Sequence, residues 1–203
     1  MDKIDLSRDL KPLYGPPKGK FVAVDLPKLK FLMIDGAGDP NTAQSYRDAM
    51  MALYATAYTA KFMLKLGPRK IDFRVMPLEG LWWADDMDDF RKARKDRWKW
   101  TAMIALPDAV TKADVKAAMA KAAEKKELPA LKLLRLESFR EGKAMQTLYL
   151  GPYADEGPTI EALHKAIADA GHKLRGKHHE IYMSDPRRTA PAKLKTIIRQ
   201  PFG

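Results

Sequence analysis

Apolar and polar positions along the chain change their spacing several times, and the first changes outline an extended segment followed by a helix. Residues 21–38 read as extended chain, are interrupted near Pro27 and end in glycines. From Asp39, a residue type that favours the N-cap, apolar side chains recur at helical spacing as far as Leu66. Because Pro40 suits the first helical turn, we predict a helix from Asp39-Pro40 to about Leu66.

The rest of this first stretch has the pattern of two strands separated by a polar segment. Gly67-Pro68 should end the helix, since neither residue type readily continues one. Residues 70–76 and 99–106 are apolar runs of strand length. Residues 78–97 lie between them, and their many charges predict a long, polar insertion.

A second stretch repeats the plan of the first. Residues 132–153 are again extended chain, interrupted at Glu141-Gly142 and ending in a glycine turn. A helix is predicted from Gly157-Pro158 to Ala170, with Gly171 as its stop. Two strand patterns follow it, at residues 177–185 and 193–202.

The order strand, helix, strand, strand therefore occurs twice, joined by a helix rich in lysine and alanine from about Lys112 to Lys126. We predict an α+β fold of duplicated β-α-β-β units, with antiparallel sheets that form a concave ligand cleft and helices on the outer face. We expect one domain over residues 1–203. Its first half would span 20–106, its linking helix 107–130 and its second half 131–203.

Composition narrows the class of protein. With 203 residues, of which 46% are apolar, the chain can bury a substantial core. The absence of cysteine excludes disulfides, thiolate metal sites and a cysteine nucleophile. The N-terminal residues carry charges where a secretory signal needs an apolar stretch, and no apolar run is long enough to cross a bilayer. We expect a cytoplasmic protein, monomeric or homodimeric, with no membrane partner.

The net charge of +11 raises nucleic acid as a partner, because a basic surface can neutralise phosphates. The lysines are instead spread along segments such as residues 112–126, where their spacing is typical of a solvated face. No nucleic-acid-binding motif accompanies them. We therefore do not expect nucleic acid to be a partner.

Candidate chemistry gathers in two short segments. All four tryptophans lie between Trp82 and Trp100, and a lone carboxylate, Glu180, lies in the run HHEIYM. Aromatic faces attract cations, and a carboxylate held among apolar groups can pair with a cation or take up a proton. The combination indicates a pocket for an aromatic or cationic small molecule. The alternative is that Glu180 forms a structural ion pair, for example with Arg187 or Arg188.

Side-chain alternation assigns faces to several of these residues. On a strand, His178, Glu180 and Tyr182 share one face, and Trp98 and Trp100 share another. Trp82 and Trp83, as neighbours in a loop, cannot both point the same way. We expect at least two tryptophans to line the pocket; the alternative is that they are core residues.

The remaining candidates are weaker. Glu79 is either a second pocket carboxylate or a turn residue. Tyr54 and Tyr58 lie one helical turn apart, and such a stripe lines either a site or a core. The candidate ligand-binding residues are Trp82, Trp83, Trp98, Trp100, Glu79, Tyr54, Tyr58 and His178.

The sequence contains no motif for metal binding, for a catalytic nucleophile or for nucleotide binding. The four histidines form no ligand triad, because His178 and His179 are adjacent and point oppositely on a strand. There is no nucleophile elbow, phosphate-binding loop or dinucleotide fingerprint. We expect neither a metal nor a cofactor.

Three segments resemble those of one family: PLEGLWW at residues 77–83, LGPYADEGPTIEALH at 150–164 and KHHEIYMSDPRRTAPAKLKTIIRQPF at 177–202. The chain thus resembles the GyrI-like small-molecule-binding family, relatives of the effector domains of multidrug-responsive regulators. The resemblance implies an SHS2-type duplication with a pocket for hydrophobic, often cationic compounds around a central glutamate, which Glu180 matches. Unlike the regulators, the chain is expected to have no DNA-binding segment before the domain.

Some stand-alone members of the family are similar to cyclopropanoid cyclopropyl hydrolases, which open the strained ring of DNA-alkylating natural products. In such an enzyme Glu180 would activate water and Tyr149 or Tyr182 would donate a hydrogen bond, while Trp82, Trp83 and Trp100 would sandwich the ligand. Three functions therefore remain. They are a binder of small molecules for xenobiotic or toxin resistance, a hydrolase of reactive cyclopropanes, and an interaction protein acting on a macromolecule such as DNA gyrase.

Overall fold

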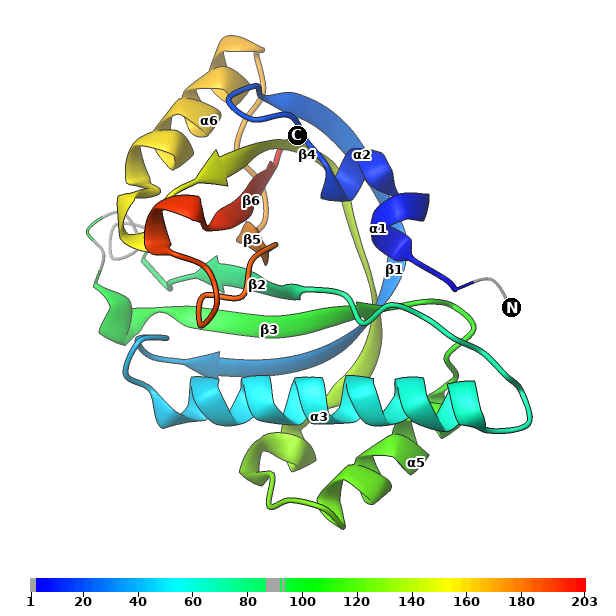
Figure 1. The fold of residues 1–203 in the computed structure, drawn as a ribbon. Coiled ribbons are helices and arrows are strands. Elements are labelled where there is room, and N and C mark those ends of the chain that lie inside the picture. Colours follow the sequence, from blue (N-terminus) through cyan, green and yellow to red (C-terminus); the bar gives the residue numbers. More distant parts are fainter. Residues whose placement is uncertain (1–2, 87–91, 93) are drawn as a thin grey trace.

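The computed structural model describes residues 3–86, 92 and 94–203. Within this part of the chain, six strands form a closed antiparallel barrel in the order β1-β3-β2-β5-β6-β4 (Figure 1). The strands are β1 (Val22–Ala37), β2 (Leu78–Trp83), β3 (Lys99–Leu106), β4 (Arg135–Leu150), β5 (His178–Tyr182) and β6 (Lys195–Pro201). The helices are α1 (Leu6–Asp9), α2 (Lys11–Tyr14), α3 (Gln44–Leu66), α5 (Lys112–Ala123) and α6 (Gly157–Asp169).

The predicted duplication is present in the order of the elements. One half is β1-α3-β2-β3, the other is β4-α6-β5-β6, and α5 lies between them in sequence. The halves pair along both edges, β1 with β4 and β2 with β5, so the two antiparallel sheets close on each other. The predicted α+β class and the duplicated β-α-β-β units are confirmed.

The two interruptions predicted in the long strands lie opposite each other. Leu26 pairs with Gly142 and Lys28 pairs with Arg140, and the ladder misses one step at Pro27. Proline has no N–H to donate, and Gly142 adopts a φ of 75°, a left-handed conformation that glycine tolerates. Both strands therefore change direction at the same point of the barrel.

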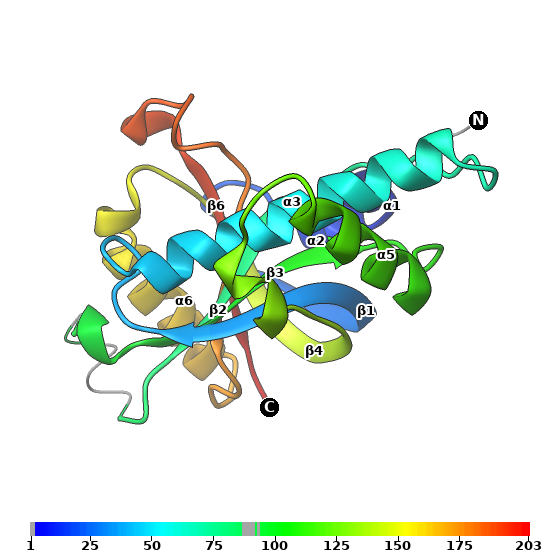
Figure 2. The same ribbon diagram turned by 90° about the horizontal axis from the view of Figure 1, so that it is seen from below.

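The long helix α3 packs on the outer face of β1 and β3. Its buried stripe is rich in alanine, including Ala49, Ala52 and Ala57, which lets the helix approach the sheet closely. Figure 2 shows α5 alongside α3, and in Figure 1 α5 lies on the side of α3 away from the barrel. The second helix, α6, covers the outer face of β4 and β6 through Leu163 and Ile167. These three helices thus lie outside the barrel, as predicted.

The observed elements differ from the predicted ones in three places. The helix begins at Gln44, because Asp39 instead organises a turn in which its carboxylate accepts a hydrogen bond from the Asn41 N–H at 2.9 Å. Residues 70–76 are extended but form no strand in the described structure beyond an isolated bridge between Phe73 and Ile4. Their place in the sheet is taken by β2, which the sequence pattern assigned to the polar insertion.

The remainder of that insertion follows β2. Residues 87–91 and 93 lie outside the described residues, and Lys95–Arg97 form a short 3-10 helix that leads into β3. Among the described residues, no helix combines the length and the apolar character needed to cross a bilayer.

Candidate functional site

Glu180 lies on the outer face of β5, and the residue paired with it on the adjacent strand β2 is Gly80. Its carboxylate accepts a hydrogen bond from the Tyr182 hydroxyl at 2.7 Å and lies 3.0 Å from Nε2 of His178. Only 14% of its side-chain surface is exposed. Burial opposes ionisation, but the hydrogen bonds from His178 and Tyr182 outweigh it and hold the pKa of Glu180 below its usual value.

Aromatic rings from both halves gather beside this carboxylate. The indole N–H of Trp82 donates to the Tyr182 hydroxyl at 3.0 Å, so the two rings are linked across the junction of the halves. Tyr46 from α3 lies 5.7 Å from the Trp82 ring and 4.9 Å from the Trp100 ring, measured between centroids. Trp98 packs edge-on against Trp82 at 5.9 Å. The result is a continuous aromatic group around Glu180.

Two glycines make room for these rings on the outer face. A Cβ atom at Gly36 would overlap the Trp100 ring, and one at Gly80 would lie 2.6 Å from the Trp82 indole nitrogen. Both glycines lie on strands, so the two indoles pack closely against the backbone of β1 and β2. Both indoles are buried, packed between the sheet and Tyr46 near the N-terminal end of α3.

The structure adds a residue that the sequence reasoning missed, Glu156, at the N-cap of α6. Its side chain is buried beside that of Glu180. Burial and the neighbouring charge of Glu180 raise the pKa of Glu156 to about 9. At neutral pH the pair therefore holds one proton on Glu156 and a negative charge on Glu180. The sequence signal that could have identified Glu156 is its position directly before Gly157-Pro158, where a helix cap is expected.

Two further tyrosines border the pair. Tyr153 packs edge-on against Tyr182 at 5.5 Å. Burial and the charge of Glu156 raise the pKa of Tyr153 to about 12, and burial with the charge of Glu180 raises the pKa of Tyr182. Both phenols therefore keep their protons at neutral pH and can act as hydrogen-bond donors.

The remaining predicted tyrosines lie farther out. Tyr149 is on the same face as Tyr182, but its hydroxyl donates to the carbonyl of Pro152 at 3.1 Å. Tyr54 accepts a hydrogen bond from the Leu78 N–H at 3.2 Å. Tyr58 stacks on Tyr54 and is 48% exposed. The structure gives none of the three a contact with Glu180.

Glu79 and Trp83 lie on the opposite side of the sheet. Because β2 is a strand and not a loop, Glu79 and Trp83 point into the barrel while Trp82 points out. Within the barrel, Glu79 accepts a hydrogen bond from the Tyr14 hydroxyl at 2.9 Å and lies 3.0 Å from Nε2 of His179. The structure therefore does not bring Glu79 or Trp83 together with Glu180.

The contacts of Glu79 belong to a buried polar network that fills one end of the barrel. Nδ1 of His179 lies 2.9 Å from Glu141, so a carboxylate faces each ring nitrogen. Burial opposes the charge of His179, but Glu141 outweighs it and raises the pKa of the imidazole. Arg199 donates to Gln146 at 2.9 Å and to Glu141 at 3.4 Å. Arg199 is thus one positive group beside the two carboxylates inside the barrel, and the raised pKa of His179 favours a second.

The ion pair that the sequence left open for Glu180 is not formed with Arg187, which pairs with Asp185 at 2.9 Å. Among the described residues, no group of three or more histidine and acidic side chains could hold a metal ion. The outer-face site therefore consists of a carboxyl pair, tyrosine hydroxyls and indole rings. Such a site can hold a cation, stack an aromatic ring or transfer a proton.

Comparisons with known proteins identify a family for the chain. The family model described as GyrI-like small molecule binding domain matches residues 20–201. An uncharacterized conserved protein from Listeria innocua is 38% identical, with a TM-score of 0.89 over 99% of this chain and 100% of that one. A hydrolase from Listeria innocua is 37% identical, with a TM-score of 0.86 over 99% and 100%.

A more distant structure shares the fold alone. The C-terminal domain of EcmrR is 12% identical, with a TM-score of 0.56 over 91% of this chain and 97% of that domain. A search among proteins of curated function finds no match.

Proposed function

Because the chain belongs to the family of GyrI-like small-molecule-binding domains, we propose that it binds hydrophobic, aromatic or cationic small molecules beside Glu180. The observation that carries this proposal is an ionised and largely buried carboxylate inside a group of aromatic rings. A cation can pair with Glu180 while its apolar parts contact the partly buried Trp98, which packs against the buried Trp82. Such binding suits a role in resistance to xenobiotics or toxins.

A second candidate function is hydrolysis of a reactive cyclopropane, and the carboxyl pair favours it. Glu180 is ionised and can accept a proton from water, while Glu156 holds a proton that it can give away. The likeness to a Listeria hydrolase across the whole chain supports the same candidate.

The reaction balances with these two groups. The water oxygen bonds to a ring carbon as Glu180 takes its proton, and the strained carbon–carbon bond breaks. The electron pair of that bond passes to a conjugated carbonyl group, whose oxygen takes a proton from Glu156 or from the Tyr182 hydroxyl. Proton exchange with solvent then restores the carboxyl pair.

The test compares the parent protein with Glu180→Gln and with Glu127→Gln, an exposed glutamate in the loop after α5 that serves as a matched control. Each is incubated with a cyclopropane-bearing alkylator and followed by mass spectrometry and tryptophan fluorescence. Catalytic formation of the water adduct by the parent and Glu127→Gln, but not by Glu180→Gln, supports the hydrolase. Quenching without a mass change, weakened in Glu180→Gln alone, supports the binder. Absence of both signals contradicts both functions.

A further inference from the structure

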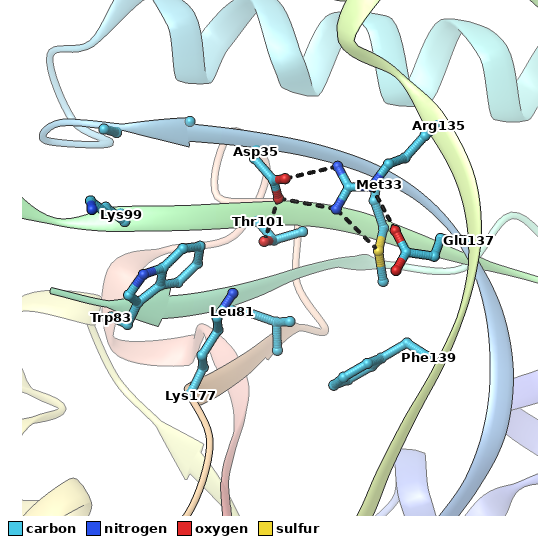
Figure 3. Close-up of a pocket in the computed structure, with 12 residues that line it drawn as sticks. Met33, Asp35, Leu81, Trp83, Lys99, Thr101, Arg135, Glu137, Phe139 and Lys177 are labelled. Carbon is cyan, nitrogen blue, oxygen red and sulfur yellow. Dashed lines mark hydrogen bonds and ion pairs between the residues drawn. The ribbon is translucent and has the colours of Figure 1, made fainter. Parts of the chain in front are cut away.

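A cavity of about 570 Å³ opens at the end of the barrel opposite the polar network, on the inner face of the sheet (Figure 3). Trp83, Leu81, Met33 and Phe139 supply an apolar wall to it. Its volume is within the range of small-molecule sites. Side-chain alternation along β2 separates it from Glu180, since Leu81 and Trp83 point inward whereas Trp82 points outward.

Most charges around this cavity are already paired. Arg135 forms ion pairs with Asp35 at 3.0 Å and with Glu137 at 2.7 Å. Asp35 also accepts a hydrogen bond from the Thr101 hydroxyl at 2.6 Å. Lys99, which lines the cavity, pairs at 2.6 Å with Asp85, which does not. The charges of these groups therefore compensate one another without a charged ligand.

Lys177 differs from the other cations of the lining. Its Nζ atom lies 3.3 Å from the centroid of the Trp83 ring, and no carboxylate among the described residues forms an ion pair with it. Figure 3 shows its side chain beside Trp83, on the side of the cavity away from Phe139. The ammonium is partly buried, and burial lowers the pKa of Lys177. Asp35 attracts this charge and Arg135 repels it, but neither carboxylate of the lining forms an ion pair with Lys177, so the ammonium gains from an anion bound in the cavity.

We propose that this cavity is a second ligand site, which takes a small aromatic carboxylate. The ligand ring stacks on the face of Trp83 that the ammonium now covers, and its carboxylate pairs with Lys177. Leu81 and Phe139 receive the apolar edge of the ligand. The site is separate from the outer-face site beside Glu180, and the two differ in charge preference: cations at Glu180 and anions at Lys177.

The test uses 2-naphthoate and NMR spectra of the four indole N–H groups, whose signals are assigned by single Trp→Phe variants. We expect 2-naphthoate to shift the Trp83 signal, while a cationic naphthylmethylammonium probe shifts Trp82 and Trp98. Lys177→Gln should weaken 2-naphthoate binding by about 5-fold, the scale of one partly exposed charge pair. Lys177→Arg should restore most of the affinity.

Two variants serve as controls. Lys99→Gln removes a lining lysine that is already paired, and Glu180→Gln alters only the outer face, so both should bind 2-naphthoate as the parent does. Equal affinity in Lys177→Gln, shifts confined to Trp82 and Trp98, or a Trp83 shift as large with neutral 2-naphthamide would each overturn the proposal. Failure of 2-naphthoate to bind at millimolar concentration would overturn it as well. Binding beside Glu180 is tested separately, by the cationic naphthylmethylammonium probe.

Discussion

Glu156 and Glu180 are neighbours on the outer face of the barrel, yet the two carboxyl groups hold opposite protonation states at neutral pH. Glu180 takes the charge because His178 and Tyr182 donate hydrogen bonds to it. Glu156 is left buried beside that charge, so it retains its proton. The division of roles follows from unequal hydrogen bonding of two chemically identical groups.

The raised pKa of Glu156 predicts a pH-dependent stability. Since its folded pKa is about 9 and its unfolded value is 4.5, the folded state binds the extra proton between these limits. The contribution is fully present below pH 4.5 and is lost as pH rises toward about 9. Glu156→Gln, which keeps a neutral donor, should therefore exceed the parent in melting temperature by a margin that grows from pH 5 to 9.

Melting temperatures measured across that range check the prediction. The control is Glu161→Gln on the exposed side of α6, for which the difference from the parent should stay constant. A constant difference for Glu156→Gln would show that Glu156 is ionised in the folded protein.

Removal of the Tyr182 hydroxyl should make Glu180 harder to ionise. Tyr182→Phe deletes the 2.7 Å hydrogen bond to the carboxylate. If an aromatic cation binds beside Glu180, its binding is lost as pH falls through the Glu180 pKa, and that midpoint should rise by about one pH unit in the variant. Calorimetric titration with benzyltrimethylammonium measures it. Tyr58→Phe, at an exposed tyrosine, should leave the midpoint unchanged.

Gly36 should tolerate no side chain. Gly36→Ala places a methyl group where the Trp100 ring now lies, and Trp100 is fully buried against Tyr46. The ring must shift, at a cost of about 1–3 kcal/mol in the free energy of unfolding. Urea denaturation followed by tryptophan fluorescence gives this value. Gly157→Ala, where an added Cβ meets no atom within 4 Å, should change stability little.

The sequence pattern predicts the elements whose periodicity is regular. The strand over residues 99–106 has the predicted bounds, and the helix predicted over 157–170 ends one residue early at Asp169. The pattern does not separate the strand LEGLWW from the charged run that follows it, so it predicts the two together as one polar segment. Residues 70–76 have strand composition but no neighbouring strand, and composition alone cannot supply a partner.

Much of the candidate site depends on that one strand. Once residues 78–83 form β2, alternation separates Trp82 from Glu79 and Trp83 without further information. The pairing of Glu156 with Glu180 could not be derived in this way. It joins the N-cap of α6 to the middle of β5, and only the packing of the helix on the barrel brings the two groups together.

The buried network predicts that the N-terminal segment depends on Arg199. Its guanidinium donates to the carbonyl of Leu13 at 2.7 Å, in addition to Gln146 and Glu141. Arg199→Met leaves these acceptors without their donor inside the barrel, which should cost about 3–5 kcal/mol in unfolding free energy. Trypsin should also cleave after Lys18 faster than in the parent.

Urea denaturation and timed proteolysis with mass analysis test both effects. Arg187→Met is the control, because its side chain is 87% exposed and its pair with Asp185 should contribute no more than about 1 kcal/mol. Unchanged proteolysis in Arg199→Met would mean that other contacts hold the N-terminal segment in place.

Pairing along both edges also protects the chain from aggregation. Each half alone would leave two bare strand edges, β1 and β2 in one and β4 and β5 in the other, with N–H and C=O groups free to recruit another chain. In the barrel each half covers the edges of its twin. The short β2 to β5 seam, from Glu79 to Trp82, is therefore where opening would first expose a template for strand addition.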